Sequence, residues 1–202
     1  MTDIVYVYGG KAYLNITNRC PCNCTFCIRQ NGDGVGSAAT LWHREDPTAE
    51  QVVEALKAFD FTPYDEVIFC GYGEPTCALD VLKTAATYLR GAYPALGIRL
   101  NTNGLGDLIN GRSIAAELAA CVDVVSISLN APTKEKYLAV THPSFGEESF
   151  EAMLTFARTC KEAVKKVIFT VVDVIPAEDI AASRALADNL GIPLRVREYT
   201  AD

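Results

Sequence analysis

The chain has 202 residues, of which 50% are hydrophobic, and a formal net charge of −7. This length supports one substantial core and is too short for two, so we expect a single domain over residues 1–202. The acidic balance gives no indication of nucleic-acid binding. The amino terminus does not resemble a secretion signal, and no apolar run reaches the roughly 18 residues of a membrane span. We therefore expect a cytoplasmic protein without a membrane partner.

The first half of the chain begins with two short strands and then a long loop. Residues 5–8 and 12–16 read as strands joined by a turn at Gly9-Gly10. Residues 31–39 are rich in glycine and small side chains, which predicts an irregular loop. We expect this loop to lie over whatever the preceding cysteines hold. A helix should follow Pro47, capped by Thr48 or Asp46.

From there, apolar strands and amphipathic helices alternate to the end of the chain. The pattern predicts strands at residues 67–70, 98–100, 122–129, 167–174 and 194–196. It predicts further helices at residues 79–89, 113–120, 147–164 and 177–189.

Counted from residue 12, this makes six strands separated by five helices, which indicates an α/β fold. The strands look apolar throughout, as expected for parallel strands that are covered on both faces. A full eight-unit barrel needs about 250 residues, so we expect a partial, open (β/α)6 TIM-like barrel with a short N-terminal β-hairpin. A doubly wound open sheet is the alternative. In either fold, ligand sites form at the carboxyl ends of the strands.

The eight cysteines are distributed unevenly along the chain. Four of them crowd into residues 20–27, and this crowding in a chain without a secretion signal favours metal ligation over disulfides. Cys20, Cys24 and Cys27 have the spacing C-x3-C-x2-C, and three thiolates suit an iron–sulfur cubane with one iron left open. We expect Cys22 to point elsewhere. The remaining cysteines should pack as small hydrophobic side chains: Cys70, Cys77, Cys121 and Cys160.

Structural zinc is the alternative interpretation of the same loop. Cys24 and Cys27 have the spacing of half a zinc knuckle. The second half of such a site is missing, because neither His43 nor His142 lies at a finger-like spacing. The sequence therefore favours an iron–sulfur cluster.

The C-x3-C-x-aromatic-C loop, directly after a first barrel strand, resembles the signature of the radical S-adenosylmethionine (SAM) superfamily. This resemblance implies a [4Fe–4S] cluster on Cys20, Cys24 and Cys27. It also implies that the amino and carboxylate groups of SAM chelate the open iron, and that Phe26 lies against the adenine.

A glycine-rich turn follows the second parallel strand of the prediction, with the residues Gly71, Tyr72, Gly73 and Glu74 before Pro75. Glycines there let the backbone approach a ligand closely, although such a turn is more often only a turn. The superfamily has a Gly-Gly-Glu-Pro turn at this strand end, whose backbone receives the amino group of SAM. Tyr72 stands where a glycine is common.

Short polar side chains close the next two strands, at Asn101, Asn103, Ser128 and Asn130. They could hold a ribose or a carboxylate, or serve only the chemistry of the turns. These segments resemble the strand ends of glycyl-radical-enzyme activases, in which an acid stands at the position of Asn101. The resemblance makes Ser128 and Asn130 the candidates for the sugar and the methionine carboxylate of SAM.

Asp173 interrupts the apolar run of residues 171–174, where a buried carboxylate needs a partner or a ligand. A structural ion pair with Arg195 or Arg197 would also satisfy it. Some other polar residues could border the same cavity, without a spacing that singles them out: Arg99, Tyr137, His142 and Arg197.

From residues 15–29 through CGYGEPT, LNTNGLG and SISLNAPT, the chain is similar to the small radical SAM proteins associated with TatD-type nucleases. The resemblance implies that an electron donor such as flavodoxin or ferredoxin reduces the cluster. SAM is then cleaved to methionine and a 5′-deoxyadenosyl radical, which takes hydrogen from an unidentified substrate. An activase that forms a radical on a partner protein, and a non-catalytic iron–sulfur or zinc module, are the alternatives.

Overall fold

The computed structural model describes residues 3–199, which form one sheet of seven strands in the order β1-β2-β3-β4-β5-β6-β7. The first pair is an antiparallel hairpin, β1 (Val5–Tyr8) and β2 (Lys11–Leu14). Every later strand runs parallel to its predecessor. These strands are β3 (Glu66–Phe69), β4 (Gly97–Thr102), β5 (Val124–Ser128), β6 (Lys166–Val172) and β7 (Leu194–Arg197).

The helices connect successive strands. They are α1 (Ala49–Lys57), α2 (Leu79–Ala92), α3 (Gly106–Asn110), α4 (Ala115–Cys121), α5 (Lys134–Thr141), α6 (Ser149–Ala163) and α7 (Ala177–Asn189). The five predicted helices are all present, with Thr48 as the cap of α1. The sequence did not reveal α3 and α5. Both are short, and the α5 segment KEKYLAVT lacks an apolar stripe at helical spacing.

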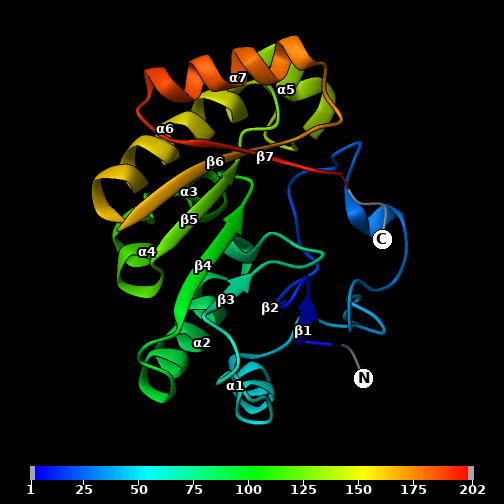
Figure 1. Ribbon diagram of the computed structural model, residues 1–202, viewed down its shortest axis with the longest axis vertical. Helices are drawn as coiled ribbons and strands as arrows, with labels where there is room; N and C mark the ends of the chain where they lie inside the picture. Colours follow the sequence, from blue (N-terminus) through cyan, green and yellow to red (C-terminus); the bar gives the residue numbers. More distant parts are fainter. Residues whose placement is uncertain (1–2, 200–202) are drawn as a thin grey trace.

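The strand order distinguishes between the two folds that the sequence left open. A doubly wound sheet reverses its strand order at a switch point, whereas here the order follows the chain without reversal. Right-handed crossovers in one direction place the helices on a single side of the sheet, as Figure 1 shows. The prediction of an open, partial barrel is therefore confirmed.

The sheet curves so strongly that its two edges face each other. In a flat seven-stranded sheet, β1 and β7 would lie about 29 Å apart, at ~4.8 Å per strand. Burial raises the pKa of Tyr6 on β1, yet the positive charge of Arg197 on β7 is close enough to oppose that shift. Beyond β7, the Tyr199 hydroxyl accepts a hydrogen bond of 3.0 Å from Asn31, which follows the cysteine loop.

The two faces of the sheet differ in character, which corrects the expectation of strands that are apolar throughout. The face toward the helices carries fully buried apolar side chains, among them Leu14, Phe69, Leu100, Ile127 and Phe169. Because side chains alternate along a strand, the intervening residues point to the other, inner face. These residues are largely polar: Tyr13, Arg99, Asn101, Ser126, Ser128, Thr170, Arg195 and Arg197.

The glycine-rich loop of residues 31–39 contains no helix or strand, as predicted. It packs along the outer edge of β1, where Ser37 N donates to Val7 O (2.9 Å) and Val7 N donates to Ser37 Oγ (2.8 Å). Gly36 is required there, because a Cβ atom would lie 2.2 Å from Val7 O and its φ is +61°. The loop thus covers a sheet edge that would otherwise expose unpaired backbone groups, and its Gly32 O accepts a hydrogen bond from the Tyr72 hydroxyl of the glycine-rich turn (2.7 Å).

Within residues 3–199, no helix combines the length and apolarity that crossing a membrane requires.

Candidate functional site: the cysteine loop at the mouth of the barrel

The cysteine loop between β2 and α1 is held in place by the end of a helix. The last carbonyl groups of a helix have no partner within the helix, and those of α5 accept hydrogen bonds from the loop. Asn23 N donates to Thr141 O (3.0 Å) and Thr25 N donates to Val140 O (2.9 Å). The helix that the sequence did not reveal therefore supports the backbone between the cysteines.

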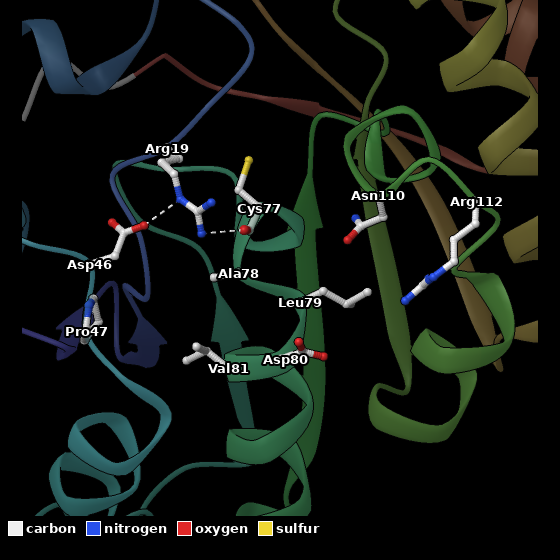
Figure 2. A pocket seen from close by; sticks show the side chains of 10 residues that line it. All are labelled: Arg19, Asp46, Pro47, Cys77, Ala78, Leu79, Asp80, Val81, Asn110 and Arg112. Atoms are coloured by element: carbon white, nitrogen blue, oxygen red, sulfur yellow. Dashed lines mark hydrogen bonds and ion pairs between the residues drawn. The ribbon is translucent and has the colours of Figure 1, made fainter.

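Asp46 holds the beginning of the same loop. Its carboxylate accepts hydrogen bonds from Thr17 Oγ1 (2.7 Å), Asn18 N (2.9 Å) and Arg19 Nε (2.7 Å). Arg19 also donates to Cys77 O (2.6 Å), so that its guanidinium joins Asp46 to the turn before α2 (Figure 2). Partial burial disfavours the charge of Asp46, but these hydrogen bonds hold its pKa below the usual value. The sequence predicts Asp46 only as a possible helix cap, a position that Thr48 takes.

A cavity of about 310 Å³ lies beside this ion pair, at the start of α2 (Figure 2). Arg19, Asp46, Asn110 and Arg112 supply its polar groups. None of the residues that the sequence predicted as ligands lines this cavity. The cavity therefore lies beside Arg19 and Asp46, which hold the start of the cysteine loop, and the four crowded thiols do not line it.

The Cys22 thiol lies between those of Cys20 and Cys24 and contacts both. Hydrogen bonds from the Cys22 thiol lower the pKa of both Cys20 and Cys24, while the same contacts raise the pKa of Cys22. Cys22 is buried, whereas Cys20 and Cys24 are half-buried. The expectation that Cys22 points elsewhere is therefore wrong. Cys27 is also half-buried, and burial raises its pKa.

Arg29 brings a positive charge to this cluster of thiols. Its guanidinium donates to Cys22 O (3.2 Å) and Tyr72 O (3.4 Å), which ties the cysteine loop to the glycine-rich turn. Its charge adds to the Cys22 hydrogen bonds in lowering the pKa of Cys20 and Cys24. Arg29 is not among the predicted site residues, although its place two positions after the third cysteine is visible in the sequence.

Glu74 has an inward-facing carboxylate that binds the protein itself. Oε1 accepts hydrogen bonds from Thr76 N (3.1 Å), Thr76 Oγ1 (2.8 Å) and Thr102 Oγ1 (2.8 Å), and Oε2 accepts one from Asn103 N (2.7 Å). Burial raises the pKa of Glu74, and these hydrogen bonds oppose that shift. Through the hydrogen bonds to Thr102 and Asn103, the Glu74 side chain joins the glycine-rich turn to the end of β4 and positions both. The side chain is only 3% exposed.

The two glycines of the turn make room for the chain rather than for a ligand. A Cβ at Gly71 would lie 2.2 Å from Asn15 Oδ1, and a Cβ at Gly73 would lie 2.2 Å from Thr17 O. The neighbouring Glu74 N donates to Arg19 O at 2.8 Å. Glycine is needed at both positions because the base of the cysteine loop packs directly on the turn.

The polar residues at the ends of β4 and β5 lie at the same mouth. Asn103 Nδ2 is 3.9 Å from Cys20 Sγ and 3.6 Å from Cys22 Sγ. Asn101 is half-buried on the inner face, and its buried Oδ1 lacks a hydrogen-bond partner among the described residues. Ser128 ends β5 half-buried. Asn130 is buried with φ +63°, a left-handed conformation that asparagine tolerates better than most residues.

Asp173 differs from its prediction. It follows the last residue of β6 and is exposed, so it is not a buried carboxylate that requires a ligand. Asp173 Oδ1 accepts a hydrogen bond from Tyr199 N (2.8 Å), and Asp173 N donates to Arg197 O (3.0 Å). Within residues 3–199, no ion pair joins its side chain to Arg195 or Arg197. The strand ends at Val172, two residues earlier than the apolar run suggested.

The donor set fits an iron–sulfur cluster. Cys20, Cys24 and Cys27 are free, half-buried thiols, and three thiolates are what a cubane with one open iron takes from a protein. Among residues 3–199, no group of three cysteine, histidine or acidic side chains is arranged to hold a single metal ion. A cubane instead offers a separate iron to each thiolate. Beneath the loop, the buried Tyr137 hydroxyl has no hydrogen-bond partner in the described structure. Burial, together with nearby Cys22, raises the pKa of this hydroxyl, which is thus a donor close to the sulfurs.

The sequence profile of the Radical SAM superfamily matches residues 14–187 of this chain. The chain belongs to the Radical SAM superfamily. The match runs from the end of β2 through α7, and therefore includes the cysteine loop, the glycine-rich turn and the strand ends described above. No curated protein matches the chain, and the narrower resemblance to the TatD-associated proteins stays a prediction.

Solved structures share the fold. A radical SAM methyltransferase from Sphaerobacter thermophilus superposes with a TM-score of 0.66 at 15% identity, covering 96% of this chain and 68% of that one. The structure of anSMEcpe with bound AdoMet superposes with a TM-score of 0.66 at 19% identity, covering 93% of this chain and 50% of that one. SuiB from Streptococcus suis, bound to S-adenosylmethionine, superposes with a TM-score of 0.65 at 17% identity, covering 93% of this chain and 38% of that one. The chain thus spans half or less of the last two proteins.

Members of the Radical SAM superfamily use a [4Fe–4S] cluster together with SAM as their cofactors.

Replacing Gly73 with alanine should disrupt the contact between the turn and the cysteine loop. The new Cβ would meet the Thr17 carbonyl at 2.2 Å, and backbone on both sides prevents an easy shift. We expect the free energy of unfolding to fall by about 1–3 kcal/mol, measured by urea unfolding of the metal-free protein. Gly91→Ala is the control, because Gly91 lies in α2 with open space around an added Cβ. This change should raise the free energy of unfolding by up to about 1 kcal/mol. Equal stability of Gly73→Ala and the wild type would contradict this packing.

Replacing Glu74 tests its positioning role. Glu74→Ala leaves the donors of Thr76, Thr102 and Asn103 without their acceptor, and each such buried group costs about 1–3 kcal/mol. Glu74→Gln retains one oxygen and should lose less. Both losses should appear in the metal-free protein, where no cofactor contributes, whereas the exposed control Glu45→Gln should be neutral. If Glu74→Ala were destabilising only when cofactor is bound, Glu74 would be a ligand and not a positioning residue.

Proposed function

We propose that this protein is a radical SAM enzyme in which Cys20, Cys24 and Cys27 hold the [4Fe–4S] cluster. The observation that carries the proposal is the grouping of three half-buried thiols, of which Cys20 and Cys24 lie near enough to act on the pKa of Cys27. The amide of Asn103 lies beside Cys20. Cys22 is the buried thiol between Cys20 and Cys24, and we assign it no iron. Its hydrogen bonds to the two neighbours hold the loop when the thiols carry no metal.

The SAM site would extend from the open iron across the ends of β3, β4 and β5. The amino group of SAM is a donor, and the turn formed by Gly71, Tyr72 and Gly73 offers it backbone carbonyls. Glu74 would act indirectly, by holding this turn against Asn103. Phe26 is half-buried beside the third cysteine and could stack on the adenine. Four polar groups remain for the ribose and the carboxylate: Asn101, Asn103, Ser128 and Asn130.

When bound, the reduced cluster and SAM supply a 5′-deoxyadenosyl radical that abstracts hydrogen from the substrate. The protein's part is to orient and to protect. Arg29 favours the thiolate form of Cys20 and Cys24, and Asn103 brings an amide donor to the sulfur of Cys20. The loop backbone is fixed by α5 and Asp46, so the ligands need little reorganisation to meet the cluster.

We further propose that residues 1–202 act as one core domain and receive electrons from a flavodoxin or a ferredoxin. A reducing compartment such as the cytoplasm suits this chemistry, and all eight cysteines are free thiols. Asp173, exposed and bonded to Tyr199, is the weakest of the predicted ligands, and we give it no role in binding SAM.

Anaerobic reconstitution tests the proposal. The wild type should bind close to a full cluster by iron and sulfide analysis, and release 5′-deoxyadenosine after chemical reduction with SAM. Alanine at Cys20, Cys24 or Cys27 should abolish both, because a cubane needs all three thiolates. Cys22→Ala is the matched control from the same loop and should retain the cluster. Zinc in place of iron, or a cluster that yields no 5′-deoxyadenosine, would refute the proposal that the protein is a radical SAM enzyme.

A further inference from the structure

The inner face of the barrel carries three arginines that the SAM site does not use. Arg99 lies in the middle of β4, and Arg195 and Arg197 lie on β7. The acid bonded to this group is Glu66, whose Oε2 is 3.2 Å from Arg99 Nη2 and 3.1 Å from Lys11 Nζ. One carboxylate thus serves two cations, within a chain whose net charge is −7.

Arg99 itself is incompletely satisfied. It is 7% exposed, and among the described residues its buried Nε has no hydrogen-bond partner. A guanidinium presents five donors in a fixed fork, and a buried donor without an acceptor is unfavourable. The side chain would be satisfied by an acceptor from a molecule bound at the inner face.

The two arginines of β7 approach this position from the opposite edge of the sheet. Partial desolvation, followed by repulsion from Arg99 and Arg197, lowers the pKa of Arg195. Burial raises the pKa of Tyr13, and the charges of Arg99 and Arg197 oppose that shift. The three guanidiniums therefore lie near one another, and the Glu66 carboxylate, which is shared between Arg99 and Lys11, does not balance all of their charge, so they repel each other. An anion between them would remove that repulsion.

The depth of Arg99 separates this position from the SAM site. Arg99 precedes Asn103 by four residues along β4 and its end, which corresponds to roughly 13 Å at ~3.3 Å per residue. Asn103 lies at the sulfurs of Cys20 and Cys22. The methionine carboxylate, chelated at the cluster, belongs at the level of Asn103. An anion bound to Arg99 therefore belongs to a second molecule, deeper in the barrel.

We propose that Arg99, Arg195 and Arg197 bind the oxyanion of a small-molecule substrate, a carboxylate or a phosphate. The inference rests on the proposed function, because it places the rest of that molecule between the arginines and the SAM site. Tyr13 and Cys70 would flank it on the inner face, and the exposed side chains of Arg195 and Arg197 leave the position accessible from solvent. Guanidiniums suit both oxyanions, because their paired donors match the paired oxygens.

Calorimetric titration of the reconstituted, SAM-loaded protein tests this site, with inorganic phosphate and succinate as probes in a chloride buffer. We expect at least one probe to bind at one site per chain. Arg99→Gln and Arg197→Gln should each weaken that binding by about tenfold or more, the effect of losing a charge-assisted hydrogen bond. Arg158→Gln, an exposed arginine on α6, should leave the affinity unchanged. Arg197→Gln decides the outcome if Arg99→Gln fails to fold.

Each result has a distinct meaning. Binding of phosphate alone assigns a phosphorylated substrate, and binding of succinate alone assigns a carboxylate. Binding of neither probe, or equal weakening by Arg158→Gln, overturns the inference. Cluster content and 5′-deoxyadenosine release are measured on the same preparations: a protein that cleaves SAM but binds no anion refutes only the anion site. A protein that binds an anion through Arg99 but holds no cluster refutes only the proposed radical SAM function.

Discussion

The site depends on one constraint: the cysteine loop has no regular secondary structure over most of its length, so its backbone groups need partners from elsewhere. The end of α5 accepts from Asn23 and Thr25, and Asp46 accepts from Asn18. The glycine-rich turn packs so closely on the loop that a side chain at residue 73 would not fit. Three segments distant in sequence thus hold three thiols in position. A loop held in this way can present its ligands before any metal binds.

The buried carboxylate of Glu74 extends the same constraint to the sheet. It bonds Thr76 in its own turn, and Thr102 and Asn103 at the end of β4. Since the Asn103 amide in turn lies beside the sulfurs of Cys20 and Cys22, a shift of the turn would also move that amide. Burying this charge is unfavourable, as the raised pKa of Glu74 shows. The hydrogen bonds compensate and make the position of β4 specific.

Much of this could be predicted from local patterns, and the rest could not for identifiable reasons. The helices with apolar stripes and the six-strand count were correct, because burial of one helix face is visible as periodicity. The α5 helix was missed because its residues lack that stripe. Cys22 was misplaced, because spacing along a loop does not determine where each sulfur points. The supporting role of Asp46 was missed because its partners Thr17, Asn18 and Arg19 lie almost 30 residues away in sequence. The contact of Arg29 with Tyr72 O spans 43 residues, so its position after the third cysteine does not by itself reveal that partner.

The misreading of the strands has a further consequence. Segments such as GIRLNT and LRVR contain an apolar residue at every second position, and they were read as apolar throughout. In an open barrel with helices on one side, only half of each strand needs to be apolar, so the polar half is free to serve ligands. Arg99 illustrates this: its neighbours Ile98 and Leu100 pack in the core, while its own guanidinium is buried on the inner face with an unpaired donor. Stability and chemistry thus lie on opposite faces of the same six residues.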